Sequence, residues 1–170
     1  MARVTVVALP AFTRFIVRGS AKAAAAIGGA FGIALPVEAC RAAGDGERSA
    51  LWLGPDEWLL LAPEGEGTDL FPLLQRSLGA EPASIVDISE RQLGISVAGE
   101  RAADVLNAFN PLDLDPAAFP VGTVTRTVFA KAEIVMWRTD IAAFHIEVWR
   151  SFAPYVLGCL EEACREYIAA

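Results

Sequence analysis

The sequence predicts an α+β protein with mainly antiparallel sheets and packed helices. Strand-length apolar runs are joined by short turns, as in Ala50–Pro63, where a Pro55-Asp56 turn separates two such runs. Helical apolar stripes interrupt these strands, and that mixture is typical of α+β domains. The 170 residues fit one domain, or two small, tightly packed lobes of 1–84 and 85–170.

The chain begins with two β-branched, partly alternating stretches. Val4–Leu9 and Phe12–Arg18 are predicted strands, joined near Pro10 as the first two elements of one sheet. Ser20 is a suitable N-cap for the apolar helix that follows, and Gly32 supplies its C-terminal stop. A helix is therefore expected between these two residues.

A buried hairpin is the next predicted feature. A weaker strand, Val37–Ala42, and a turn at 44–46 lead into it. Pro55 presets the turn, and the near-continuous apolarity of both arms suggests strands covered on both faces. Trp52 and Trp58 each need an acceptor for an indole N–H, so the hairpin should lie in a core or at a partner interface.

The second half continues the alternation of helices and strands. Its expected elements are a helix from Thr68 to Gly79, strands Ile85–Ile88 and Leu93–Ala98, a helix from Glu100 to Phe109, strands Thr123–Ala130, Glu133–Arg138 and Ala143–Trp149, and a last helix from Ser151. The proline-rich segment 111–122 is expected to be a structured loop with at most one helical turn.

Composition excludes several functional classes. With 14 basic and 21 acidic residues the net charge is −7, and no basic cluster exists to track phosphates, so no nucleic-acid partner is expected. No apolar run is long enough for a membrane span. Three cysteines and no signal-like N-terminus favour a reduced, cytoplasmic protein. The 54% apolar content is consistent with apolar surface covered by another subunit.

No catalytic or metal-binding group is predicted. The single histidine, His145, lies between apolar neighbours on a strand; we expect it to be structural and to face the rim of the sheet. Cys159 and Cys164 are five positions apart, about 140° around a helix, so they diverge and do not form a zinc site. No phosphate-binding glycine loop is present.

Asp87 is the acid of greatest interest, because it ends an apolar strand where a carboxylate can project into a cleft. The structural alternative is stronger. An Asp two residues before a serine, here Ser89, commonly accepts local hydrogen bonds, and Arg91 could pair with it.

Four blocks of the sequence resemble the gamma subunit of heterotetrameric sarcosine oxidase: ALWLGPDEWLLLAP at 50–63, VDISERQ at 86–92, NPLDLDPAAFPVG at 110–122 and WRSFAPYVLGCLEEA at 149–163. The resemblance implies a non-catalytic structural subunit that supports oxidative demethylation of sarcosine to glycine. It implies direct packing on the alpha subunit, with beta and delta in the same complex. It also implies no cofactor in this chain, with FAD, FMN, NAD and tetrahydrofolate in alpha and beta and zinc in delta.

The segment VDISERQLGISVAGERAADVL is also similar to glycine-cleavage aminomethyltransferases, where an Asp at the position of Asp87 faces folate. This implies the same folate-binding α+β fold. The chain departs from that pattern, with Glu90-Arg91-Gln92 in place of His-Met and about half the length. An alternative function is therefore a free-standing folate-binding one-carbon protein that uses Asp87, and a free-standing homo-oligomer is a third.

Candidate partner-interface residues are aromatic and leucine side chains of the hairpin and the proline-rich loop, because aromatic anchors concentrate at interface centres. They are Trp52, Trp58, Leu112, Leu114 and Phe119.

Overall fold

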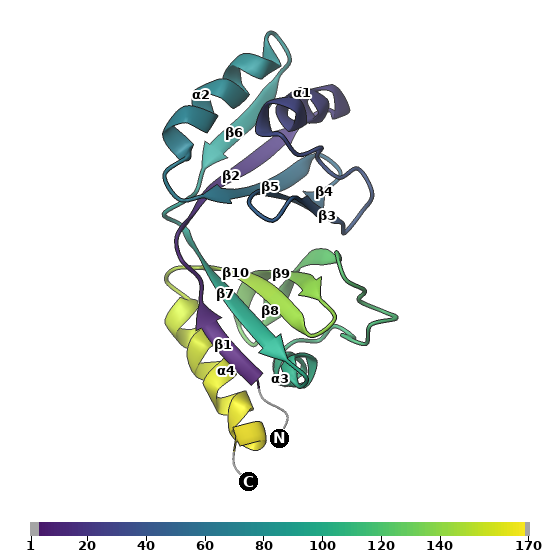
Figure 1. The fold of residues 1–170 in the computed structure, drawn as a ribbon, viewed down its shortest axis with the longest axis vertical. Helices are drawn as coiled ribbons and strands as arrows, with labels where there is room; N and C mark the ends of the chain where they lie inside the picture. The colour runs from purple at the N-terminus through teal and green to yellow at the C-terminus, as the bar shows by residue number, and fades with distance from the viewer. Residues whose placement is uncertain (1–3, 169–170) are drawn as a thin grey trace. The chain divides into compact units, whose positions relative to one another are not determined.

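A computed structural model describes residues 4–168, which divide into two compact units. Unit 2 is the continuous segment 10–89, and unit 1 combines the residues before Pro10 with those from Glu90 onward. Within the described residues, each unit contains a five-stranded antiparallel sheet and two helices (Figure 1). The expected lobes, 1–84 and 85–170, differ from these units because the first strand belongs with the C-terminal part of the chain and because the boundary lies after Ser89.

Unit 2 carries its strands in the order β3-β4-β5-β2-β6. Its elements are β2 (Phe12–Gly19), α1 (Ala21–Phe31), β3 (Ala42–Gly44), β4 (Ser49–Gly54), β5 (Glu57–Pro63), α2 (Gly67–Leu78) and β6 (Ala83–Asp87). β4 and β5 form the predicted hairpin, in which Trp52 lies opposite Trp58. Every strand pairing in this sheet is antiparallel, as predicted.

The core of unit 2 lies between its sheet and both helices. Alternate residues of β2 and β5 point into it, because successive strand side chains face opposite ways. Its buried members are Phe15, Val17, Ala24, Ile27, Phe31, Leu35, Ala50, Trp58, Leu60, Ala62, Leu70 and Leu74. The indole N–H of Trp58 donates to the Pro36 carbonyl at 2.8 Å, so the ring is buried with its polar group satisfied.

Helix α1 begins and ends at the predicted caps. The Ser20 hydroxyl accepts from the Ala23 N–H at 3.1 Å, and Gly32 ends the helix in the left-handed region at φ 88°. A Cβ on Gly28 would lie 3.1 Å from the Ile33 carbonyl oxygen, so glycine allows the chain after α1 to return closely against the helix.

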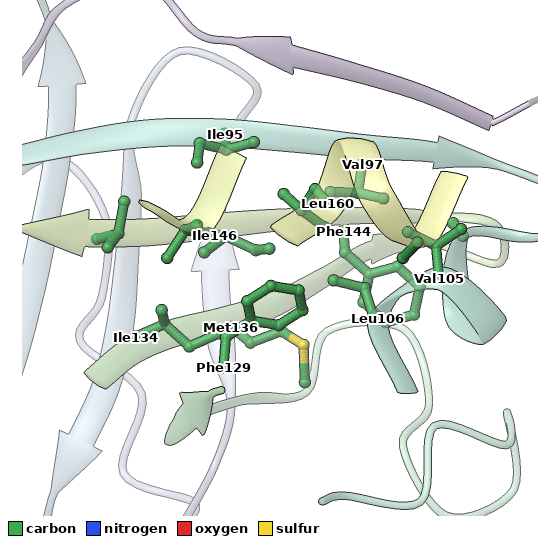
Figure 2. Close-up of a cluster of buried hydrophobic side chains, with 14 of the residues drawn as sticks. Ile95, Val97, Val105, Leu106, Phe129, Ile134, Met136, Phe144, Ile146 and Leu160 are labelled. Atoms are coloured by element: carbon green, nitrogen blue, oxygen red, sulfur yellow. The ribbon is translucent and has the colours of Figure 1, made fainter. Parts of the chain in front are cut away.

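Unit 1 carries its strands in the order β1-β7-β10-β9-β8. Its elements are β1 (Val4–Ala8), β7 (Gln92–Gly99), α3 (Ala102–Asn107), β8 (Val124–Phe129), β9 (Ala132–Asp140), β10 (Ala143–Trp149) and α4 (Ala153–Ile168). Figure 2 shows part of its core, where Ile95, Phe144 and Met136 of three strands gather with Val105 and Leu106 of α3 and Leu160 of α4. Large aliphatic and aromatic side chains thus fill the space between sheet and helices.

A buried arginine holds the proline-rich loop 111–122 against the rest of unit 1 by hydrogen bonds. The Arg138 side chain donates to the carbonyls of Leu114 at 3.0 Å and Phe119 at 2.8 Å, and also to the backbone of the β9–β10 turn. The Asn110 side chain donates to a carbonyl of β8 at 2.7 Å. The predicted structured loop is present, and its backbone is held by side chains that the sequence pattern did not indicate.

The prediction that β1 and β2 are neighbours in one sheet is wrong. β1 pairs with β7, while β2 lies between β5 and β6. Pro10 has no N–H to donate, and the Leu9 N–H donates instead to the Gly94 carbonyl at 2.8 Å. The chain therefore leaves one sheet at Pro10 and enters the other.

Several predicted boundaries also shift. The strand expected at Val37–Ala42 is absent from the described chain apart from its last residue, because Cys40 takes a positive φ of 59° that a strand does not tolerate. Helix α2 begins at Gly67 with Glu66 in the N-cap position, two residues before Thr68, which was the predicted N-cap. The helix expected from Glu100 to Phe109 is the shorter α3, and the β9–β10 turn lies after Asp140. None of the described helices is long and apolar enough to cross a membrane.

Candidate functional site

Asp87 ends β6 opposite Phe15 of β2. One oxygen of its carboxylate accepts hydrogen bonds from a neighbouring residue. Its Oδ1 accepts from the Ser89 N–H at 2.9 Å and from the Ser89 hydroxyl at 2.6 Å. The Ser89 oxygen in turn accepts from the Arg14 backbone N–H at 2.9 Å. The local hydrogen bonds expected for Asp87 are present. Arg91, the other expected partner, lies over the Trp149 ring in unit 1.

Asp87 also lines an open pocket of about 340 Å³ at the start of α2. The pocket is lined by Gly67, Thr68, Phe71, Pro72 and Asp87. A Cβ on Gly67 would lie 3.5 Å from Asp87 Oδ2, so the first residue of the helix sits directly against the carboxylate. The Phe71 ring stacks on Phe15 with centroids 6.0 Å apart, which fixes the apolar wall.

The pocket has few side chains that could take part in a reaction. Among the described residues that line it, Asp87 alone carries a titratable side chain, and Thr68 supplies a hydroxyl. General acid–base catalysis needs a group within hydrogen-bond reach of the proton it moves, usually supported by a second group that binds or orients the substrate. A single exposed carboxylate beside a phenyl ring is suited to contacting a ligand and does not form a complete catalytic set.

His145 is buried in unit 1 and does not face the rim, so that part of its prediction is wrong. Its Nε2 lies 2.7 Å from Oε1 of Glu147, two residues later on the same face of β10. Glu147 is fully buried and His145 is 8% exposed. The Trp137 ring lies beside the imidazole at 5.9 Å between centroids. Strand alternation puts His145 and Glu147 on one face of β10, but it does not predict that this face is buried.

The cysteines do not form a reactive or metal-binding cluster in the part of the chain that the structure covers. Cys164 is buried and Cys159 partly buried on α4, and no group of three or more potential ligands occurs among residues 4–168. Burial raises the pKa of the Cys164 thiol, and the nearby Glu161 carboxylate raises it further. Its thiolate, the nucleophilic form, is therefore disfavoured.

Of the five expected partner-interface residues, three lie in the two cores. Trp58, Leu114 and Phe119 are at most 5% exposed. Their side chains do not offer surface to a partner, which corrects the expectation for them, because neighbouring segments cover them within their own units. Trp52 and Leu112 pack partly buried against the same cores. For these two the interface role stays a prediction.

The sequence reasoning missed a cluster of exposed aromatic side chains where β10 leads into α4. Trp149, Phe152 and Tyr155 are each more than two-fifths exposed. The last helix was expected from Ser151, but α4 starts only at Ala153, so Phe152 lies in the preceding turn. The available signal was Pro154, which is best tolerated in the first turn of a helix and so marks its start.

The two antiparallel sheets and four helices found within residues 4–168 are those of an aminomethyltransferase-like fold. The described chain is similar in structure to the glycine cleavage system aminomethyltransferase T from Bartonella henselae, with a TM-score of 0.69 over 94% of this chain and 45% of that chain. Sequence identity is 14%, so this similarity concerns the fold alone. It confirms the predicted fold class.

Closer similarity defines the family. A sarcosine oxidase subunit gamma from Corynebacterium sp. (strain U-96) is 37% identical over 147 residues, which are 86% of this chain and 71% of that relative. A chain of the heterotetrameric sarcosine oxidase from Corynebacterium sp. U-96, in complex with pyrrole 2-carboxylate, matches with a TM-score of 0.92 and 34% identity, over 98% of this chain and 86% of that chain. The model of the sarcosine oxidase, gamma subunit family matches residues 18–166, and this chain belongs to that family.

Proposed function

We propose that this chain is a non-catalytic structural gamma subunit of a heterotetrameric sarcosine oxidase, and that it supports oxidative demethylation of sarcosine to glycine by the other chains. It packs directly on the alpha subunit and joins beta and delta in a cytoplasmic complex. The companion chains hold FAD, FMN, NAD, tetrahydrofolate and zinc, and this chain holds none of them. Membership of the gamma subunit family supports the assembly part of the proposal.

The observation that carries the non-catalytic part is the state of the Asp87 carboxylate. One of its oxygens accepts two hydrogen bonds from Ser89. The other residues that line the adjacent pocket, Gly67, Thr68, Phe71 and Pro72, have no titratable side chain. The histidine is committed elsewhere, in a buried pair with Glu147. Each of these groups is therefore engaged in local contacts within its own unit.

The test is to produce the four-chain enzyme with and without this subunit, and to measure assembly by gel filtration and sarcosine turnover by oxygen consumption. We expect omission to reduce the yield of assembled enzyme, and Asp87→Asn within the complex to leave the turnover number unchanged. Asp69→Asn, an exposed acid on α2, is the matched control. Loss of turnover in fully assembled Asp87→Asn enzyme, with Asp69→Asn unaffected, would contradict the proposal.

A folate-binding one-carbon protein is the second candidate, and the pocket between Asp87 and Phe71 favours it. At about 340 Å³ the pocket is at the small end of the range for small-molecule sites. Titration of tetrahydrofolate into the isolated chain, followed by calorimetry, separates the candidates. Saturable binding heat that is lost in Asp87→Ala and kept in Asp69→Ala would establish folate binding. Absence of binding heat in the unmodified chain would eliminate this second candidate.

A further inference from the structure

The open pocket at the start of α2 combines a negative charge with an aromatic wall. Gly67, Thr68, Phe71, Pro72 and Asp87 line it, and all five belong to unit 2. Asp87 is the one charged residue among these lining residues. A carboxylate attracts a cation by its charge, and a phenyl ring attracts one by its quadrupole. The lining of the pocket therefore favours a cationic group.

The Asp87 carboxylate is held in place by its neighbours in unit 2. Its Oδ1 accepts from the N–H and the hydroxyl of Ser89, and Ser89 Oγ accepts from the Arg14 N–H of β2. The Ile88 N–H donates to the Arg14 carbonyl at 2.9 Å, which continues the contact with β2 past the end of β6. Asp87 Oδ2 accepts no hydrogen bond from residues 4–168. A carboxylate held in this way loses little conformational freedom on binding and keeps one oxygen available.

The aromatic wall of the pocket is also fixed. The Phe71 ring stacks on Phe15, with centroids 6.0 Å apart and 28° between the ring planes, and Phe71 packs partly buried against the core of unit 2. A guanidinium is planar, so it can lie against a ring while its N–H groups reach a carboxylate. An ammonium is a compact point charge without a flat face. Among cationic side chains, arginine therefore suits a pocket that contains both Phe71 and Asp87.

The charge of Asp87 has no partner in the part of the chain that the structure describes. No lysine or arginine of residues 4–168 forms an ion pair with it. Most bases of unit 2 already pair with other acids: Arg18 with Asp56, Lys22 with Glu81, Arg41 with Glu38 and Arg48 with Glu66. The carboxylate is thus available to a cation from outside the chain.

The chemistry of the pocket distinguishes between sources of that cation. No group of three or more potential metal ligands occurs within residues 4–168. An exposed ion pair and an exposed cation–π contact each strengthen binding by at most about fivefold, which is too little to hold a free small cation at millimolar concentration. A second copy of this chain brings another net charge of −7, which opposes self-association.

A cationic side chain of a bound protein is in a different position. The loss of translational and rotational freedom is shared with the rest of the interface, so the contact itself adds directly to affinity. The interface also excludes water from the pocket, and a charge pair strengthens when it is desolvated in good geometry. A companion subunit that presents an arginine therefore fits the pocket better than a free cation does.

We infer that the pocket between Asp87 and Phe71 receives an arginine side chain of a companion subunit of the oxidase, with the guanidinium paired to Asp87 and stacked on Phe71. The assignment rests on the proposed role of this chain as a gamma subunit, and it adds the place of one contact and the chemistry of the partner. A buried pair of this kind fixes the register of two docked surfaces.

The experiment measures binding of this chain to the purified assembly of the other three chains, by biolayer interferometry. Asp87→Asn keeps a carbonyl oxygen for Ser89 but removes the charge, so we expect Kd to rise about tenfold. Phe71→Leu keeps an apolar wall but removes the ring, so we expect a rise of about two- to fivefold. Asp69→Asn, in the first turn of α2 but outside the pocket lining, is the matched control and should change Kd by less than about twofold. Thermal unfolding followed by circular dichroism shows whether each variant is folded.

Two further measurements identify the contact as an arginine pair. Added NaCl should raise Kd of the unmodified chain and of Asp69→Asn more steeply than Kd of Asp87→Asn, because salt screens a pair that Asp87→Asn lacks. Phenylglyoxal modifies accessible arginine side chains. Binding of the unmodified chain should protect one arginine of the companion chains from this reagent, as read by mass spectrometry of the complex.

The outcomes separate this inference from the proposed function. If the unmodified chain binds its companions and both pocket variants bind equally well, the inference is overturned while the structural-subunit proposal stands. If the unmodified chain does not bind the assembly, both fail. Protection of a companion lysine and of no arginine overturns the inference. Saturable binding of methylguanidinium or tetrahydrofolate to the isolated chain, below about millimolar and lost in Asp87→Asn, shows a free ligand in the pocket and also overturns it.

Discussion

Trp58 in unit 2 and Trp149 in unit 1 occupy comparable places and have opposite surroundings. Each belongs to an inner strand of a five-stranded antiparallel sheet, β5 and β10 respectively. Trp58 is 2% exposed, and its indole N–H donates to the Pro36 carbonyl. Trp149 is 45% exposed and is covered on one side by Arg91.

Trp58 and Trp149 differ in exposure because different chain segments lie next to them. The chain after α1 returns against that helix, because Gly28 leaves room for its backbone, and this return supplies both cover and an acceptor for Trp58. Trp149 is the last residue of β10, and the chain turns at once into α4. An aromatic residue in a strand is therefore buried where another segment of the chain covers it, and exposed where no segment does.

The largest expected effect tests this contrast directly. Trp58→Ala should lower the free energy of unfolding by about 3–5 kcal/mol, because it leaves a cavity in a closed core. Trp149→Ala should lower it by less than about 1 kcal/mol, since an exposed ring and one arginine contact are lost. Urea unfolding of the isolated chain, monitored by circular dichroism, measures both. Losses of equal size would show that the two rings are equivalent.

The second prediction extends the comparison to buried and exposed arginines of unit 1. Arg138→Lys should lower the free energy of unfolding by about 2–3 kcal/mol, because an ammonium cannot reach the separated carbonyls that the guanidinium fork joins. Arg91→Lys, at an exposed site, should change it by no more than about 0.5 kcal/mol. Hydrogen exchange of the amides in loop 111–122 should rise in Arg138→Lys alone, and unaltered exchange there would contradict the assigned role.

A third prediction concerns the cap that starts α1 in unit 2. Ser20→Ala should lower the free energy of unfolding by about 1 kcal/mol through loss of the N-cap. The Ser20 hydroxyl also donates to Glu81 at 2.7 Å and, together with Lys22, lowers the pKa of Glu81 below its ordinary 4.5.

A lowered carboxyl pKa stabilises the folded state above pH 4.5, and this stabilisation is lost as pH falls through the folded-state pKa. The difference between Ser20→Ala and the unmodified chain should therefore shrink below pH 4.5, as measured by urea unfolding at a series of pH values. Lys22→Ala keeps the cap and removes the other partner of Glu81, so its difference from the unmodified chain should vanish below pH 4.5, whereas that of Ser20→Ala should keep the part due to the cap. A difference that is constant with pH would rule out the Glu81 contribution.

The smallest expected effects compare two helical glycines, one from each unit. Gly158→Ala on α4 should raise the free energy of unfolding by up to about 1 kcal/mol, because a Cβ there meets nothing within 4 Å and alanine favours helix. Gly28→Ala should lower it, since its Cβ would press on the returning backbone near Ile33. Thermal unfolding of both variants gives the signs, and a stabilising Gly28→Ala would show that the return of the chain is not close.

Much of the local structure was readable in advance. The Ser20 and Gly32 caps bound α1 as predicted, and the Pro55-Asp56 turn closes the β4–β5 hairpin. These features depend on hydrogen bonds and backbone preferences within one or two turns of chain, so neighbouring residues suffice to specify them. The local bonds between Ser89 and Asp87 follow from the same short-range chemistry.

Which aromatic side chains are exposed could not be predicted from short-range patterns. Aromatic residues of the hairpin and the proline-rich loop were expected to face a partner, yet Trp58 and Phe119 are buried while Tyr155 is exposed. Composition gives every aromatic ring a similar tendency to be covered. Which ring is covered depends on segments that are distant in sequence, and short-range patterns carry no information about them.

Local sequence was enough to specify most of the strands, the capped helix α1 and the turn of the β4–β5 hairpin. Long-range folding alone assigned β1 and β2 to different sheets, buried the His145–Glu147 pair and left the rings at the start of α4 uncovered. The reason is that backbone preferences and caps act over a few residues, whereas strand pairing and burial are set by contacts between parts of the chain far apart in sequence.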